Sequence, residues 1–174
     1  MGQDDTKHNL LFISKYPEII HEFTDAMKDR DIEIETAING IEAAAKIKKK
    51  NYDIVITGLS LEGYNGEQII TYLNKTAPST VCIIYTTTIS SAQLHFFINE
   101  RNVFRVFLRP VDFRGAFWEA LEEAYEYHAV QVKNEEDTGA RRQEQEKQER
   151  EIEIMDQRMR SQRQARETTN RYMK

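Results

Sequence analysis

The feature that most constrains the fold is an alternation, repeated five times in the first 130 residues, between a short apolar run and a segment with helical spacing. Short apolar runs without helical periodicity are typical of strands, and apolar residues three and four apart indicate amphipathic helices. Strands that alternate with helices form a parallel sheet covered on both faces, with right-handed crossovers. The pattern therefore predicts an α/β fold with a five-stranded parallel sheet in a three-layer sandwich.

The expected strands and helices follow from local signals. Asn39-Gly40 and Ser90 or Ser91 are typical of helix starts, and Asp112 is expected to cap the last helix of the sheet domain. In the helix after Asn39-Gly40, the apolar residues expected to face inward are Ile41, Ala44, Ala45 and Ile47. The strands are predicted at residues 10–13, 32–36, 53–58, 81–85 and 104–108.

Charge and composition exclude several classes of protein. Residues 1–132 carry 13 Lys and Arg against 19 Asp and Glu, so this part is not expected to bind nucleic acid non-specifically. No apolar run approaches the roughly 18 residues of a membrane span, and the start lacks the order of a signal peptide. The single cysteine, Cys82, lies in an apolar run and is predicted to be a core residue. A reducing cytoplasm is the expected location.

Residues 131–174 differ from the rest, because Gln, Glu and Arg dominate and too few apolar residues remain to build a core. We expect a long charged helix, and Ile152, Met155 and Met159 fit the a/d/a positions of a coiled coil. The alternative is a solvated single helix. The final residues, RYMK, contain no helix stop, so the helix is expected to link residues 1–130 to an output domain that follows.

The candidate chemistry lies where the strands end, because ligands of open α/β sheets bind at the carboxyl ends of the strands. The residues at those ends are Ser14, Lys15, Gly58, Thr86 and Arg109. None of them is an acid. The four histidines have no metal-ligand spacing, and the sequence contains neither a Ser–His–Asp order nor a glycine-rich phosphate loop.

Four blocks of sequence resemble the receiver domain of two-component response regulators, over about residues 8–128. They are LLFISKYPEI, YDIVITGLSLEGYNG, CIIYTTT and VFRVFLRPVD, and their mutual spacing also matches. The resemblance implies the flavodoxin-like (βα)5 fold. It also implies that YDIVITGLSLEGYNG is the strand and loop that carry the phosphorylated aspartate, and that CIIYTTT carries the switch threonine.

The chain departs from this family at the reaction centre. The resemblance places the phosphoacceptor aspartate at Gly58, the two metal-binding acids at Ser14 and Lys15, and the lysine at Arg109. Only the hydroxyl, at Thr86, is kept. Phosphoryl transfer to a receiver requires a carboxylate nucleophile and a cation held by oxygen ligands. We therefore expect a degenerate phosphorylation site in a pseudo-receiver, with no catalytic residue, metal or cofactor.

Two nearby acids, Asp53 and Glu62, are candidates to replace the missing phosphoacceptor carboxylate. Asp53 lies at the other end of its strand and is expected to be an ordinary strand-entry residue. Glu62 lies in the loop after Gly58, where it is expected to form an ion pair with Lys15 or Arg109.

These expectations lead to a phosphorylation-independent module for signalling, protein interaction and dimerisation, which is not an enzyme. The resemblance implies a homodimer through the face of the fourth and fifth helices, joined by the C-terminal helix, and a protein partner or fused output domain. Expected interface residues are Phe96, Phe97, Arg105, Phe117, Trp118, Tyr125, Ile152, Met155 and Met159. The set contains two adjacent pairs, Phe96-Phe97 and Phe117-Trp118, in which both rings cannot point inward, so exposed aromatic surface is expected. The alternative is that the outward ring lies over neighbouring helices. One alternative is a sensor that binds an anion or nucleotide in the vacated pocket, and another is a receiver with a displaced acceptor.

Overall fold

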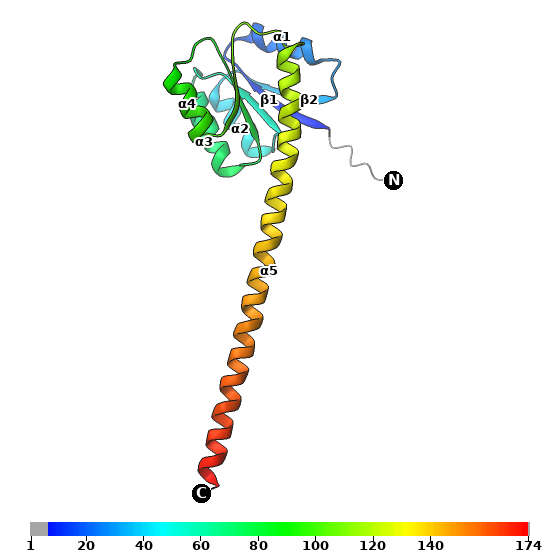
Figure 1. Cartoon of the computed structure of the whole chain (residues 1–174). Coiled ribbons are helices and arrows are strands. Elements are labelled where there is room, and N and C mark those ends of the chain that lie inside the picture. Colours follow the sequence, from blue (N-terminus) through cyan, green and yellow to red (C-terminus); the bar gives the residue numbers. More distant parts are fainter. Residues whose placement is uncertain (1–6, 174) are drawn as a thin grey trace. The chain divides into compact units, whose positions relative to one another are not determined.

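The structure is a computed structural model that describes residues 7–173. Strands and helices alternate along this range (Figure 1). In chain order they are β1 (His8–Ile13), α1 (Pro17–Met27), β2 (Ile32–Ala37), α2 (Gly40–Lys49), β3 (Ile54–Thr57), α3 (Gly66–Thr76), β4 (Val81–Thr86), α4 (Ser91–Glu100), β5 (Val103–Leu108) and α5 (Ala116–Tyr172). Every predicted strand is present, with bounds that differ by one or two residues.

The strands form one parallel sheet in the order β2-β1-β3-β4-β5. After β2 the chain crosses over β1, so that β3 pairs with the other side of β1. The carboxyl ends of β1 and β3 therefore lie side by side, with Ile13 paired to Thr57. The α/β class and the flavodoxin-like topology predicted from the sequence are thereby confirmed.

Alternate residues of each strand supply two separate cores, one on each face of the sheet. On one face, Phe12 and Ile56 pack with α1 and the first turns of α5. On the other face, Ile13 and Val55 pack with α2, α3 and α4. Cys82 belongs to the second core and is 1% exposed, which confirms it as a core residue. Burial raises the pKa of its thiol to about 12.

Two details of the predicted helices are corrected. The inward face of α2 consists of Gly40, Ala43 and Ile47, which follow helical spacing, whereas Ile41 is 63% exposed and Ala45 also faces outward. Asp112 does not cap α5, which begins at Ala116. Its side chain instead accepts a hydrogen bond from the backbone N–H of Arg114 at 3.0 Å, in the turn before the helix.

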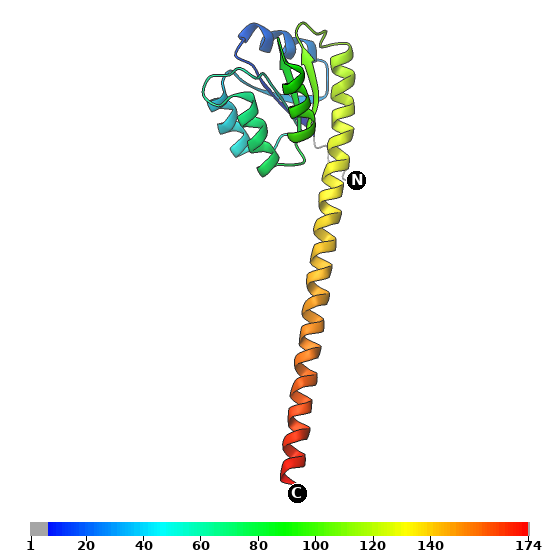
Figure 2. The same cartoon turned by 60° about the vertical axis from the view of Figure 1, so that its left-hand side comes forward.

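The chain divides into two compact units, Met1–Val132 and Lys133–Lys174. The described part of the second unit is helical through Tyr172 and is the orange and red end of the helix in Figure 2. Its apolar side chains are solvent-exposed, Ile152 by 65%, Met155 by 63% and Met159 by 59%. Between residues 7 and 173, no helix is both long and apolar enough to cross a membrane.

Candidate functional site

A small cavity lies where β1, β3, β4 and β5 end. Its volume is about 60 Å³. The five positions predicted from the strand ends all contribute to its wall, so the fold brings them together as expected for a doubly wound sheet. The lining residues are Ser14, Lys15, Tyr16, Gly58, Leu59, Ser60, Leu61, Tyr85, Thr86, Thr87 and Arg109. No carboxylate is among the described residues that line this cavity.

The two cations of the cavity lie against aromatic rings. The Lys15 ammonium is 5.2 Å from the centre of the Tyr16 ring, and it hydrogen-bonds the Ser60 hydroxyl at 3.4 Å. The Arg109 guanidinium is 4.7 Å from the same ring and 5.9 Å from the Tyr85 ring. Burial raises the pKa of the Tyr85 hydroxyl, and Arg109 opposes that rise. The electron-rich ring of Tyr16 therefore faces both cations of the cavity.

The two hydroxyls at the strand ends bond to nearby backbone. Ser14 is 7% exposed, and its side chain accepts a hydrogen bond from the N–H of Tyr16 at 3.2 Å. The Thr86 hydroxyl donates to the carbonyl of Thr88 at 3.3 Å. Both side chains thus stabilise the loops that follow their strands.

Gly58 has room for a larger residue. A Cβ atom built there would meet its nearest neighbours, the carbonyl oxygens of Tyr85 and Ile13 and a Leu61 methyl, at 3.7 to 3.9 Å. These are ordinary van der Waals distances, and the backbone of Gly58 is outside the left-handed region. Neither packing nor backbone conformation therefore requires glycine at this position.

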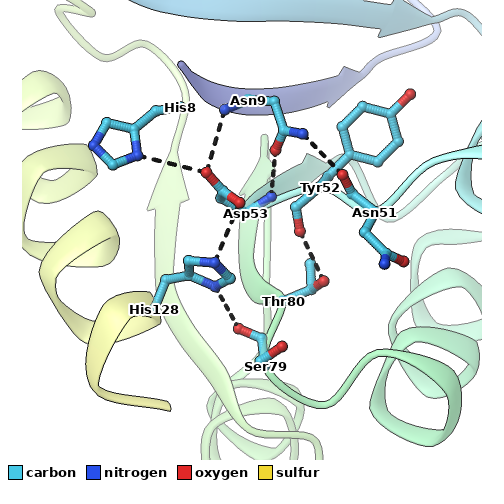
Figure 3. A network of polar contacts seen from close by, with 8 residues as sticks. All are labelled: His8, Asn9, Asn51, Tyr52, Asp53, Ser79, Thr80 and His128. Atoms are coloured by element: carbon cyan, nitrogen blue, oxygen red, sulfur yellow. Dashed lines mark hydrogen bonds and ion pairs between the residues drawn. The ribbon is translucent and has the colours of Figure 1, made fainter. Parts of the chain in front are cut away.

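The two acids considered as substitutes lie apart from the cavity. Glu62 forms no ion pair with Lys15 or Arg109 among residues 7–173, which corrects that expectation; its side chain is exposed, and its carbonyl accepts a hydrogen bond from the N–H of Gly40 at 2.9 Å. Asp53 precedes β3, at the opposite end of that strand, and contacts His8 and His128 (Figure 3). The register of β1 on β3 could have predicted the contact with His8, but the contact with His128 depends on where α5 packs.

The aromatic interface predicted from the sequence is corrected in part. Phe97 is 3% exposed, Phe117 0% and Tyr125 7%, so these rings belong to the core. Phe96 and Trp118 are the outward members of their pairs, and each is half-buried beneath an arginine. Arg101 lies 4.7 Å from the Phe96 ring and Arg30 lies 4.3 Å from the Trp118 ring. Neighbouring side chains therefore cover the outer rings.

A larger hollow of about 660 Å³ lies over α2 and α3, away from the strand ends. Its volume suits a small ligand. Most of its wall consists of exposed side chains such as Lys48, Tyr72 and Lys75. Arg101 also lines it, and the Nε atom of this side chain is buried without a hydrogen-bond partner among the described residues.

Comparisons with known proteins show which family the fold belongs to. A family model described as the response regulator receiver domain matches residues 11–115. No curated protein matches the chain. The three solved structures described next are 18 to 20% identical to this chain and therefore inform on the fold alone.

Three of these structures illustrate the likeness. The signal receiver domain of an HD domain-containing protein from Pseudomonas fluorescens is 19% identical with a TM-score of 0.67, over 71% of this chain and 98% of that one. A CheY-like receiver domain protein from Methanospirillum hungatei is 18% identical with a TM-score of 0.65, over 72% and 99%. An adenylate cyclase from Rhodopirellula baltica is 20% identical with a TM-score of 0.68, over 75% and 96%. Because the family model matches more than half of the present chain, this chain belongs to the response regulator receiver domain family.

Proposed function

We propose that this chain is a pseudo-receiver: a cytoplasmic signalling module that acts through protein interaction and dimerisation without being phosphorylated. The observation that carries the proposal is the absence of any carboxylate among the described residues that line the strand-end cavity. Glycine offers no nucleophile, and a serine hydroxyl beside a lysine ammonium does not fit Mg²⁺, which prefers carboxylate oxygens and is repelled by positive charge. The fold around the cavity is nevertheless that of a receiver.

The room at Gly58 allows a direct test of this proposal. We expect Gly58→Asp to fold, because its Cβ meets neighbours no closer than 3.7 Å, and still to bind no beryllofluoride with Mg²⁺, because Lys15 remains. Exchanging Ser14 and Lys15 for aspartate as well should supply the missing oxygen ligands and produce Mg²⁺-dependent chemical-shift changes around the cavity. The wild type serves as control. Beryllofluoride binding by the wild type, detected in the same spectra, would contradict a pseudo-receiver and support a displaced acceptor.

An anion sensor is the less favoured alternative. An anion between Lys15 and Arg109 would have to compete with the Tyr16 ring that both cations already face.

Two exposed apolar surfaces support a role in association. The first, the α4–β5 surface, consists of Leu94, Ile98 and Leu108, which are 41%, 40% and 50% exposed. The second, the tail stripe, consists of Ile152, Met155 and Met159. Apolar side chains at a/d spacing on an otherwise charged helix lose contact with water when two helices pair. Arg105 pairs with Glu123 across β5 and α5, which leaves it at the rim of the α4–β5 surface.

We expect the full chain to be a dimer in solution, with twice its mass of 20.4 kDa. Exchanging Ile152 and Met155 for glutamate should shift the mass to that of a monomer, because like charges would then face each other across the helix pair. Gln157→Glu with Gln164→Glu makes the same charge change on the opposite side of the helix and should leave the dimer intact. Light scattering coupled to gel filtration measures all three.

Two outcomes of that experiment would change the proposal. A monomeric wild type would contradict dimerisation. A dimer that survives the stripe variant but is lost in Leu94→Glu with Leu108→Glu would place the contact on the α4–β5 surface and leave the tail as a single helix.

Coupling to an output domain is part of the same proposal. Receiver domains are often fused to such domains, and the similar structures from Pseudomonas fluorescens and Rhodopirellula baltica are named after an HD domain-containing protein and an adenylate cyclase. Because α5 is helical from Ala116 to Tyr172, it offers a continuous link between residues 1–130 and a domain joined to residues 131–174. We propose that this helix transmits the signal.

A further inference from the structure

A cluster of three ionisable side chains lies at the end of the sheet where β1 and β3 begin, opposite the strand-end cavity. We call His8, Asp53 and His128 the His–Asp–His cluster (Figure 3). One carboxylate oxygen of Asp53 is 3.5 Å from Nδ1 of His8, and the other is 3.2 Å from Nε2 of His128. These residues come from β1, the start of β3 and α5, so the cluster joins three elements that are far apart in sequence.

Asp53 is held in a fixed orientation by the backbone. Its carboxylate accepts a hydrogen bond from the N–H of Asn9 at 3.3 Å, and its own N–H donates to the Asn9 side chain at 2.6 Å. Burial alone would raise the pKa of Asp53, but contacts with His128, Asn9 and His8 outweigh it and hold the pKa below its ordinary value. The carboxylate is therefore a charged partner for both rings.

The contacts of His128 suit the doubly protonated form of its ring. Nε2 faces the Asp53 carboxylate, while Nδ1 lies 2.8 Å from the carbonyl oxygen of Ser79 in the loop before β4. A carboxylate and a carbonyl only accept hydrogen bonds, whereas a neutral imidazole has one N–H to donate. The ring can satisfy both partners only as the doubly protonated imidazolium. Its side chain is 17% exposed, so water gives limited compensation for a lost partner.

The remaining groups around the cluster define its response to pH. The His8 ring is 56% exposed and stacks on the Tyr125 ring at a centroid distance of 4.3 Å. The Tyr125 hydroxyl is buried without a hydrogen-bond partner among the described residues, and burial followed by the Asp53 charge raises its pKa well above the ordinary value. Tyr125 therefore stays neutral.

His128 also lies on α5 close to the end of the first unit. Between His128 and Val132, no hydrogen bond, ion pair or ring contact of the described residues joins α5 to the sheet. The first unit ends at Val132, one turn later. His128 is thus the last directional contact between α5 and the sheet before the second unit begins.

We propose that the His–Asp–His cluster is a protonation-dependent clasp, in which the imidazolium of His128 fastens α5 to Asp53 and Ser79. Loss of one proton from the ring breaks one of its two contacts, and the last turn of α5 in the first unit is released. The chain would then respond to protons at the point where its C-terminal helix leaves the sheet. This inference is independent of whether the chain dimerises.

The sign of the effect follows from the two partners. The pKa of Asp53 is lower in the folded chain, so its stabilisation is present above the unfolded value of about 3.9 and is lost as the pH falls through the folded value. His128 can donate to both Asp53 and Ser79 only while both ring nitrogens carry a proton, so one of these two contacts is lost once a rising pH removes one proton. The clasp is therefore closed while Asp53 is charged and His128 is doubly protonated, and it opens toward alkaline pH.

The test combines two measurements on the full chain between pH 5.5 and pH 9. Nitrogen-15 spectra of the imidazole rings report whether His128 carries protons on both nitrogens, and amide hydrogen exchange reports protection of residues 125–132. We expect the wild type to show the doubly protonated ring at pH 6 and to lose protection in these residues by about tenfold as that ring deprotonates, since hydrogen bonds to charged groups are worth about a factor of ten or more.

Three variants distinguish the clasp from ordinary packing. Asp53→Asn and His128→Gln should each abolish the pH dependence of protection, with circular dichroism showing that the fold is kept. His95→Gln changes an exposed histidine on α4 and should behave as the wild type. A His128 ring with a single proton at pH 6, or an unchanged pH dependence in His128→Gln, would overturn the proposal. If Asp53→Asn does not fold, His128→Gln alone decides it.

Discussion

Replacing Phe117 with alanine is expected to lower the free energy of unfolding by about 3 to 5 kcal/mol, because a fully buried aromatic ring is lost and a cavity remains. Phe117 is 0% exposed. Its ring centre lies 4.7 Å from that of Phe107, 5.1 Å from that of Phe113 and 6.0 Å from that of Phe23. The ring therefore joins α5, β5 and α1 on one face of the sheet. Urea unfolding of the full chain, followed by circular dichroism, measures the loss.

Trp118→Ala is the matched control for this prediction. The neighbouring ring is half-buried and lies 4.3 Å from the Arg30 guanidinium, so its removal is expected to cost only about 1 kcal/mol. If Phe117→Ala were as stable as the wild type but changed the mass of the protein in solution, Phe117 would be an interface residue, as the sequence alone had indicated, and its burial in the core would be contradicted.

Gly66→Ala is expected to destabilise the protein by about 3 kcal/mol through a backbone clash. Gly66 is the first residue of α3, and a Cβ atom there would lie 2.2 Å from the carbonyl oxygen of Gly58. A hydrogen bond of 3.0 Å from its N–H to the carbonyl of Leu59 fixes this close approach. Since the obstacle is backbone, relief requires the loop at the strand-end cavity to move. Thermal or urea unfolding tests the prediction.

Two other glycines provide the comparison. Gly58→Ala meets only ordinary contacts and is expected to stay within about 0.5 kcal/mol of the wild type. Gly139 lies inside α5 with nothing within 4 Å of its Cβ position, so Gly139→Ala should favour that helix by up to about 1 kcal/mol. Equal stability of the Gly66 and Gly58 variants would show that α3 does not need the close approach.

Most of the fold could be predicted because it depends on local patterns. Apolar runs such as residues 81–85 have no other stable place than the inside of a sheet, and capping residues such as Asn39 and Ser90 mark helix starts. The error in α2 has a physical cause. The five apolar residues of Gly40–Lys49 are compatible with more than one helix face, and the approach of Gly40 to the Tyr64 carbonyl selects the face with Ala43 and Ile47.

The candidate site was predictable only where it depends on strand ends. Parallel strands bring Ser14, Gly58 and Thr86 to one edge whatever their side chains are, so their meeting in one cavity follows from topology. The direction in which a long side chain points does not follow from topology. Glu62 was expected to reach a cation, but Lys15 and Arg109 face the Tyr16 ring instead. Whether the site is inert in the cell stays a prediction.

The order of strands and helices, the acid-free strand ends and the change of character after residue 132 can all be predicted without a structure, because each depends on residues close together in the chain. The tertiary structure was needed to show which of Phe117 and Trp118 faces the core, since that choice depends on how α5 rotates against β5 and α1. It alone also brought His8, Asp53 and His128 together, because packing across the sheet joins residues that no local pattern connects.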